Sequence, residues 1–261
     1  MSLPPPAPAF RWTVEPWGHA LRCTPLETVA QHVFTSRQLQ LPNSEGWAAA
    51  AASVGGAPGQ VRRVKQVHGN VVRVLARGGT TEADAEAKPD GDAIVSNVPG
   101  LVLAVMVADC VPMIVADRAS GAAGAIHAGW RGTCARVGPA AVEAMRHHFG
   151  TEPSDLTVAI GPSIGPGDYE VGESLIESFQ HAGHRAGDLA RWFHRRDARL
   201  SLDLWAANRD QLIDAGVAAG RIFVCGLSTL AHPEIFDSYR VAGERAGRMA
   251  AVVAVPVPVP L

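Results

Sequence analysis

The order in which two hydrophobic periods occur along this chain is the feature that most constrains its fold. Five apolar segments between residues 61 and 128 are of strand length, and turn residues separate them from one another. The first is rich in β-branched valine and surrounds a Gly-Asn turn, and the others are shorter apolar runs. The predicted strands are Val61–Val74, Ala93–Ser96, Leu101–Ala108, Pro112–Ala116 and Ala122–Ala128.

The second half of the chain carries the helical period instead. Apolar residues at i, i+3 and i+4 predict amphipathic helices there, with two short strands between them and one short helix near the N-terminus. Clustered strands followed by helices favour an α+β fold with mixed β-sheets flanked by helices over a regular Rossmann alternation. The predicted helices are Glu45–Val54, Arg136–Phe149, Val171–Ala182 and Leu202–Ala215, and the late strands are Leu156–Ile160 and Ile222–Cys225.

We expect one domain over residues 1–261. Neither of the two loop-like stretches, residues 43–60 and 78–91, has the length or charge of an interdomain linker. The Pro-rich ends, residues 1–9 and 256–261, are expected to be extended tails that pack poorly, because proline has no backbone donor and favours polyproline II.

Charge and hydropathy exclude several classes of function. Lys and Arg number 23 against 25 Asp and Glu, so the net charge of −2 creates no global basic field for nucleic acid or an anionic membrane. The longest apolar run, Leu101–Ala108, is far shorter than the roughly 20 residues that a membrane-spanning helix needs. No secretory leader is evident, and the four cysteines form no Cys-x-x-Cys pair, so we expect a reducing, cytoplasmic setting.

Three segments carry residue types that are suited to chemistry. His68, Cys110 and His127 are each expected near the end of an apolar strand, so a sheet can bring them together. Two imidazoles and one thiolate are suitable zinc ligands, and three protein ligands leave the fourth tetrahedral position open, as in catalytic sites. Asp109 is costly to bury unpaired, so it either caps a turn or orients another group. The plainer alternatives stay open: histidines with local hydrogen bonds, and a cysteine that is a small buried apolar residue.

Further candidates for ligand binding lie downstream. Trp130 and Arg131 directly follow the His127 segment, and they suit stacking on a planar ligand and pairing with an anion. The Gly/Pro-rich loop over residues 161–172, which includes Tyr169, either cradles an anion with backbone N–H groups or is a plain connection. Arg240 is either a solvated surface cation or closes over a phosphate.

These motifs resemble those of one known family. QVHG, DAIV, ADCVP, HAGWRGT, IGPSIGPGDYEVG, a later DL-x-x-AN and SYR followed by GR occur in the order typical of the laccase-domain purine nucleoside phosphorylases. These are the YfiH-like proteins, formerly called multicopper polyphenol oxidases, and the resemblance covers about residues 30 to 250. It implies a layered αββα fold and a zinc ion bound by His68, Cys110 and His127.

The resemblance also implies an activity. Members cleave adenosine, inosine and methylthioadenosine with phosphate to give the base and pentose 1-phosphate, and adenosine deamination is attributed to them too. The expected catalytic residues are His68, Asp109, Cys110, His127 and Arg131, and the expected substrate-binding residues are Trp130, Arg131, Tyr169 and Arg240. Asp109 would orient a ligand or transfer a proton. The sequence departs from the family pattern after Phe34-Thr35-Ser36-Arg37, at Cys225-Gly226 and at Phe236-Asp237, which concerns substrate specificity.

Three alternatives remain at this stage. In a cysteine hydrolase, Cys110 would be the nucleophile and His127 its base, acting on an amide such as a peptidoglycan precursor. A copper polyphenol oxidase is disfavoured because none of the ten histidines forms a His-x-His pair, although copper in place of zinc is an alternative ion. The third alternative is a non-catalytic binding module. The expected partners are a purine nucleoside and phosphate, without nucleic acid or membrane, and the oligomeric state is left open.

Overall fold

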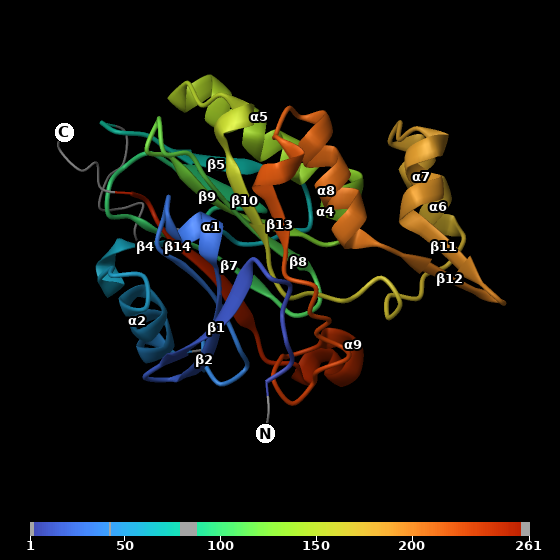
Figure 1. Ribbon diagram of the computed structural model, residues 1–261, viewed down its shortest axis with the longest axis horizontal. Helices are drawn as coiled ribbons and strands as arrows, with labels where there is room; N and C mark the ends of the chain where they lie inside the picture. Colours follow the sequence, from blue (N-terminus) through green and yellow to red (C-terminus); the bar gives the residue numbers. More distant parts are fainter. Residues whose placement is uncertain (1–2, 42, 79–87, 257–261) are drawn as a thin grey trace.

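Two six-stranded β-sheets lie against each other at the centre of the molecule (Figure 1). They are seen in a computed structural model of the chain, which describes residues 3–41, 43–78 and 88–256. In spatial order, the first sheet contains β1 (Phe10–Glu15), β2 (Gly18–Cys23), β3 (His32–Thr35), β14 (Met249–Ala254), β7 (Val102–Val107) and β4 (Val61–Arg63). The second contains β13 (Ile222–Val224), β10 (Thr157–Ile160), β8 (Val111–Ala116), β9 (Ala123–Ala128), β6 (Ala93–Ser96) and β5 (Val72–Leu75).

Both sheets mix parallel and antiparallel pairs. β4 runs parallel to β7 in the first sheet, and β5–β6 and β10–β13 are the parallel pairs of the second. The remaining neighbours within the two sheets are antiparallel. The prediction of an α+β fold with mixed sheets is therefore confirmed.

An apolar layer fills the space between the two sheets. Leu103 and Val105 of β7 face inward, and they meet a cluster that includes Ile114 of β8 and Ala125 of β9. These four side chains are at most 1% exposed. The neighbouring residues along each strand point to the opposite face of the sheet, and helices bury that face too. Both faces of these strands are therefore apolar.

Helices cover the outer face of each sheet. On the first sheet, α2 (Ser44–Ala52) packs Trp47 against Val102 and Ala104 of β7. On the second, α5 (Val137–Phe149) and α8 (Leu204–Asp214) bury Met145 and Leu212 (Figure 1). The layers follow the order helix, sheet, sheet, helix, which is the αββα arrangement that the family resemblance implied.

The remaining elements are short. α6 and α7 lie with the β11–β12 ribbon at one end of the molecule (Figure 1). Phe179 of α6 and Trp192 of α7 belong to the same core as α8, so this end is continuous with the helical layer. The elements are α1 (Thr24–Glu27), α4 (Trp130–Cys134), α6 (Ser174–His181), α7 (Ala186–Trp192), β11 (Phe193–Arg196), β12 (Arg199–Leu202) and α9 (Tyr239–Ala242).

Two local predictions are wrong. The Val61–Val74 segment is not one strand-like unit around a turn, because β4 lies in the first sheet and β5 in the second. The connection between them crosses from one sheet to the other. The helix expected over Val171–Ala182 begins only at Ser174, because residues up to Gly172 continue the preceding loop, where Glu170 forms a bridge with Ser201.

The N-terminal segment is extended, as predicted, but it does not pack poorly. The backbone N–H of Ala7 donates to Cys225 O at 2.9 Å, and Trp12 Nε1 donates to Pro4 O at 2.8 Å. Leu3 packs against the core between the sheets. At the other end, Pro256 follows β14, and residues 257–261 of the predicted tail lie outside the described residues.

Candidate metal centre

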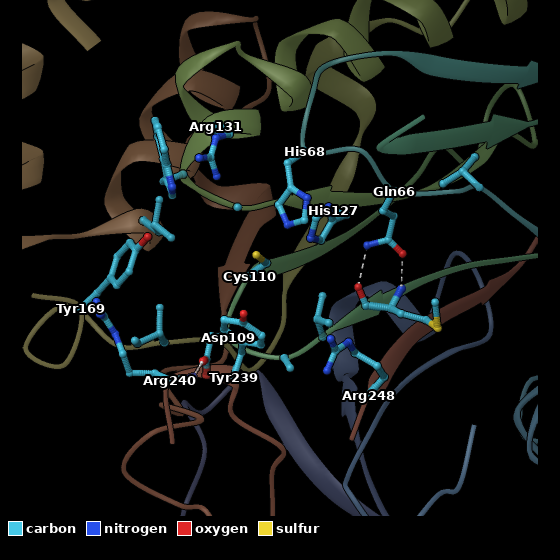
Figure 2. A pocket seen from close by; sticks show the side chains of 18 of the residues that line it. Gln66, His68, Asp109, Cys110, His127, Arg131, Tyr169, Tyr239, Arg240 and Arg248 are labelled. Atoms are coloured by element: carbon cyan, nitrogen blue, oxygen red, sulfur yellow. Dashed lines mark hydrogen bonds between the residues drawn. The ribbon is translucent and has the colours of Figure 1, made fainter. Parts of the chain in front are cut away.

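A cavity of about 990 Å³ opens between the two sheets and the α4 and α9 segments, and it collects most of the predicted site residues. Its lining includes His68, Cys110, His127, Arg131 and Arg240 (Figure 2). Trp130 and Tyr169 line it as well, together with Asp109 and Arg248. The fold thus brings together residues from six separate segments that the sequence marked as candidates or as motif members.

His68 lies in the connection between β4 and β5, not at a strand end as expected. Its φ of 61° is in the left-handed region, which non-glycine residues adopt rarely. The carboxylate of Asp92 stabilises this conformation because it accepts the backbone N–H of Val67 at 3.3 Å, of His68 at 2.9 Å and of Gly69 at 2.6 Å. The backbone is thereby held in a conformation in which the His68 side chain lines the cavity.

The same carboxylate orients His127, which lies within β9. His127 Nδ1 donates to Asp92 Oδ1 at 2.9 Å, and both side chains are buried. Burial opposes ionisation of Asp92, but the hydrogen bonds from His127 and Gly69 outweigh burial and hold its pKa below the usual value. Because Nδ1 is occupied, His127 presents Nε2 to the cavity, the arrangement that second-shell carboxylates impose on metal-binding histidines.

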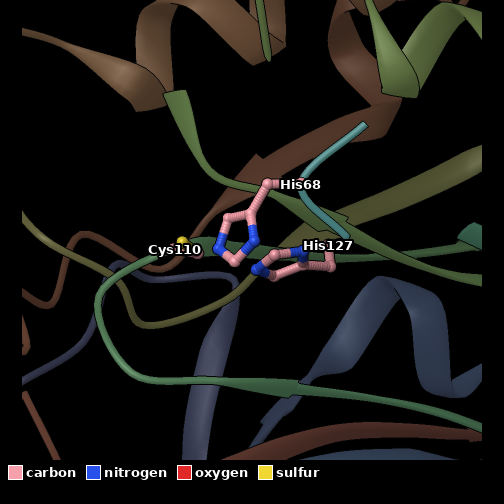
Figure 3. A group of neighbouring side chains, drawn as sticks. All are labelled: His68, Cys110 and His127. Carbon is pink, nitrogen blue, oxygen red and sulfur yellow. The ribbon is translucent and has the colours of Figure 1, made fainter. Parts of the chain in front are cut away.

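Cys110 completes a compact triad with the two histidines (Figure 3). One donor atom from each residue lies within 4.8 Å of the others, and the two imidazole rings are 4.9 Å apart and nearly perpendicular. Burial raises the pKa of the Cys110 thiol, but hydrogen bonds with His127 and His68 outweigh it and lower the pKa to about 6. Burial lowers the pKa of His127, but Asp92 and Cys110 raise it to about 9.

The residues of the triad fit a metal ion. Two imidazole nitrogens and one thiolate match a tetrahedral zinc site with one open position, and they also suit copper. Gly129 supplies the required space, since a Cβ there would lie 2.7 Å from Cys110 Sγ and 3.2 Å from His68 Cδ2. Within the part of the chain that the structure describes, this triad is the one group of three such ligands.

Arginines and aromatic rings line one wall of the cavity. The guanidinium of Arg131 stacks on Trp130 at 4.3 Å, and that of Arg240 lies 5.3 Å from the ring of Tyr169. Arg240 also donates to the backbone oxygen of Glu170. Neither arginine forms an ion pair with a carboxylate of the described residues, so their charges are available to an anion.

Asp109 is placed in the cavity wall, but its contacts are those of an anchor. Its carboxylate accepts from Thr229 Oγ1 at 2.6 Å, Ser238 Oγ at 3.0 Å and the backbone N–H of Arg240 at 2.7 Å. Among the described hydrogen bonds, none joins Asp109 to the triad. These contacts fix the start of α9 and the position of Arg240. The expectation that Asp109 orients a ligand or transfers a proton stays a prediction.

The 161–172 loop behaves as a connection more than as an anion cradle. Seven of its backbone N–H groups already donate within the protein, among them those of Ile164 to Asp109 O, Gly165 to Ser228 Oγ and Asp168 to Gly165 O. Its contribution to the cavity comes from the side chains of Ile164 and Tyr169.

Sequence reasoning missed two residues that shape the site. Asp92 precedes a buried strand, and the DAIV motif contains it, but nothing in the sequence indicates its contacts with residues 23 to 35 positions away. Gln66 of QVHG exchanges two hydrogen bonds with the backbone of Met106, at 2.7 and 2.8 Å. It extends the pairing of β4 with β7 and so holds the His68 connection to the strand that leads to Cys110.

Fold and site together define an α+β protein with a His-Cys-His centre in a cationic cavity. The chain belongs to the family described as multi-copper polyphenol oxidoreductase laccase, whose model matches residues 43–256. A curated relative, the purine nucleoside phosphorylase of Deinococcus radiodurans, is 41% identical over 82% of this chain and 78% of its own length. Adenosine deaminase RL5, from an unknown prokaryotic organism, is 36% identical over 63% of each chain.

A solved structure shares the whole architecture. The crystal structure of YlmD from Geobacillus stearothermophilus superposes with a TM-score of 0.81 at 26% identity, covering 91% of this chain and 96% of that one. The family resemblance and the fold class predicted from the sequence are both confirmed. Among the described residues, no helix has the length and apolar character needed to cross a bilayer.

Proposed function

We propose that this chain is a zinc-dependent purine nucleoside phosphorylase that cleaves adenosine, inosine or methylthioadenosine to the base and pentose 1-phosphate. The observation that carries the proposal is the His68–Cys110–His127 triad beside Arg131 and Arg240, which pair with no carboxylate of the described residues. The name of the Deinococcus radiodurans relative supports the same reaction. The partners are small molecules, a purine nucleoside and phosphate.

The chain's own residues supply binding and orientation. Arg131 and Arg240 present cationic forks suited to the oxygens of phosphate. Trp130 and Tyr169 offer aromatic faces on which a purine can stack. His68, Cys110 and His127 would hold zinc, which when bound acts as a Lewis acid that stabilises negative charge developing on a substrate oxygen. Asp92 keeps His127 in the required tautomer, and Asp109 keeps Arg240 in place.

The test is product analysis with the zinc-loaded protein. Inosine is incubated with and without phosphate, and hypoxanthine and ribose 1-phosphate are quantified by chromatography and mass spectrometry. We expect base release only with phosphate, and a loss on the order of 100-fold or more in Cys110→Ala. Cys134→Ala, a buried cysteine outside the cavity, serves as the matched control and should stay near wild type. Phosphate-dependent release that is unchanged in Cys110→Ala would refute the site assignment.

A second activity at the same site is adenosine deamination, which the name of the RL5 relative supports. Adenosine without phosphate should then give inosine and ammonia, with the same dependence on Cys110. The cysteine-hydrolase alternative predicts a different pattern: an acyl adduct on Cys110 and an activity that survives removal of metal by chelators.

Metal identity and location complete the proposal. Metal analysis of protein purified without added metal should give about one zinc per chain, and copper at that stoichiometry would replace zinc in the proposal. We place the protein in the cytoplasm, and its four free cysteines support a reducing compartment.

A further inference from the structure

Cationic side chains lie on two sides of the triad, and the proposed reaction uses only one of them. Arg131 and Arg240 lie on one side of Cys110 in Figure 2, and Arg248 lies on the other, below Gln66. Lys65, the neighbour of Gln66, and Lys88 also line the cavity. We call Lys65, Lys88 and Arg248 the second basic wall.

Arg248 is oriented by its own backbone. Its Nη1 donates to Ala246 O at 2.7 Å and to Gly247 O at 2.9 Å, and its Nε and Nη2 have no partner among the described residues. Arg248 is exposed and forms no ion pair in the described part of the chain. A guanidinium held in this way keeps one edge free for the oxygens of an anion.

In the part of the chain that the structure describes, the carboxylates near this wall are already engaged. Asp237 packs so closely on Gly247 that a Cβ there would lie 2.5 Å from its Oδ2, and its charge faces Arg37 at 3.8 Å. Asp90 lies 3.4 Å from Lys65, so among the described residues the charges of Arg248 and Lys88 on the second basic wall have no carboxylate that pairs with them. Asp109, the carboxylate in the cavity lining, has three donors of its own.

The size of the cavity agrees with a ligand that reaches both walls. At about 990 Å³, it lies at the upper end of the range of roughly 300–1,000 Å³ typical of small-molecule sites. Phosphorolysis of a nucleoside brings one anion, the attacking phosphate, which Arg131 and Arg240 are proposed to bind. The second basic wall has no ligand in that reaction.

We infer that the second basic wall binds a second phosphate, the phosphomonoester of a purine nucleoside monophosphate, with Arg248 as its main contact. This inference rests on the proposed function, because it places the nucleoside part of the ligand in the same cavity. It concerns binding alone and adds no chemical step.

The test compares the affinities of inosine and inosine 5′-monophosphate by calorimetry, with zinc-loaded protein and without free phosphate. Wild type should bind the monophosphate about tenfold tighter than inosine, and the advantage should shrink as salt is raised. Arg248→Gln should abolish most of the advantage and leave the affinity for inosine within about twofold. Arg245→Gln is the matched control, an exposed arginine three positions earlier that does not line the cavity.

Two outcomes would overturn the inference: equal affinities of wild type for both ligands, or an advantage that persists in Arg248→Gln. If Arg131→Gln loses the advantage while Arg248→Gln keeps it, the phosphomonoester binds the other wall, and the inference is overturned as well. Thermal unfolding of each variant verifies folding. Phosphorolysis of inosine is measured separately, so cleavage without a monophosphate preference rejects only this inference, whereas the preference without cleavage rejects only the proposed function.

Discussion

A single carboxylate determines the geometry of two of the three candidate metal ligands. Asp92 accepts three backbone N–H groups of the His68 loop on one side and the imidazole of His127 on the other. It is fully buried, so each of these donors would be left without water if the carboxylate were lost. Asp92 is therefore a positioning residue for the triad, and it does not line the cavity.

Replacing Asp92 tests this assignment at the level of metal affinity. In Asp92→Asn the amide presents a donor where donors already point, so we expect zinc affinity to fall by about 10- to 100-fold. The free energy of unfolding of the metal-free protein should fall by about 1–3 kcal/mol. Competition with a chromophoric chelator measures the first and urea titration the second.

Asp90→Asn is the matched control for this variant. Asp90 is two positions away, is exposed and pairs with Lys65, so its replacement should leave both quantities close to wild type. Zinc binding by Asp92→Asn as tight as by wild type would contradict the positioning role.

His32, which does not line the cavity, makes the stability of the protein depend on pH. Its ring is fully buried; Nε2 accepts from the backbone N–H of Cys23, and Nδ1 donates to Ala30 O. Burial lowers its pKa from 6.5 to about 4, despite the favourable contact with Ala30. The unfolded chain thus binds a proton on His32 between these values and the native state does not, so stability is lost as pH falls from 6.5 toward 4.

We expect His32 to contribute a loss of about 3 kcal/mol over that window, since each pKa unit corresponds to about 1.4 kcal/mol. Urea unfolding at a series of pH values measures the free energy of unfolding, which should fall less steeply with decreasing pH in His32→Gln than in wild type. His148→Gln, which removes an exposed histidine of α5, keeps His32 and should keep the steep slope. Parallel slopes for wild type and His32→Gln would show that His32 does not titrate in this way.

At the scale of elements, the turn from β9 into α4 joins the metal ligands to the arginine wall. Only two residues lie between His127 and Trp130, and the second of them, Gly129, is the N-cap of α4. Its backbone passes so close to Cys110 that a side chain has no room. The turn therefore requires glycine because of close approach, not because of a positive φ, since its φ is −72°.

Gly129→Ala should disturb the triad more than the fold. The added methyl would press on Cys110 Sγ and His68 Cδ2, so we expect the zinc content to fall well below that of wild type and stability to drop by about 1–3 kcal/mol. Metal analysis after dialysis against a weak chelator and thermal unfolding measure these changes. Gly187→Ala, in α7 with open space around the position, should be neutral or stabilising by up to about 1 kcal/mol. Full zinc content in Gly129→Ala would contradict the close packing.

The sequence predicted the elements whose pattern is strong and local. The apolar runs that became β6 to β10 and the periodic segments of α5 and α8 are in place to within a few residues. β1 to β3 and β14 were not predicted. β14 lies between β3 and β7 in the first sheet, more than 200 residues from β3 in sequence, and its Ala-rich MAAVVA lacks the alternation of a half-buried strand.

In the candidate site, too, the sequence predicts the chemistry of the residue types but not the contacts between side chains. Imidazole and thiolate chemistry predicted the triad without structure, and the structure brings His68, Cys110 and His127 together. Asp92 could not be predicted, because its partners are defined by the crossing of loops and not by spacing in the chain. Asp109 was named as a candidate from the sequence, but its contacts could not be predicted, because its partners lie 120 to 131 positions away.

At the scale of the whole molecule, the triad lies where the chain crosses between the two sheets. Cys110 belongs to the turn from β7 in the first sheet to β8 in the second, and His68 to the connection from β4 to β5, which makes the same crossing. His127 comes from the second sheet alone. The separation of the ligand atoms therefore depends on how the sheets pack against each other.

Ile114 tests this dependence, because it lies in the apolar layer between the sheets and is 0% exposed. Ile114→Ala should cost about 2–5 kcal/mol, and the melting temperature should fall by about 2–4 °C for each kcal/mol in a chain of this size. Because both sheets share this layer, tryptophan fluorescence and far-UV circular dichroism should report one common transition at the lower temperature. Zinc affinity should weaken in the same variant, although Ile114 does not line the cavity.

Val14→Ala, at an 82% exposed position of β1, is the control for this variant. It should leave stability within about 0.5 kcal/mol of wild type and zinc affinity unchanged. Two outcomes would contradict this dependence: separate transitions for the two probes, or wild-type zinc affinity in an Ile114→Ala protein that has lost the expected stability. Either would show that the loops, and not the packing of the sheets, determine the positions of the triad residues.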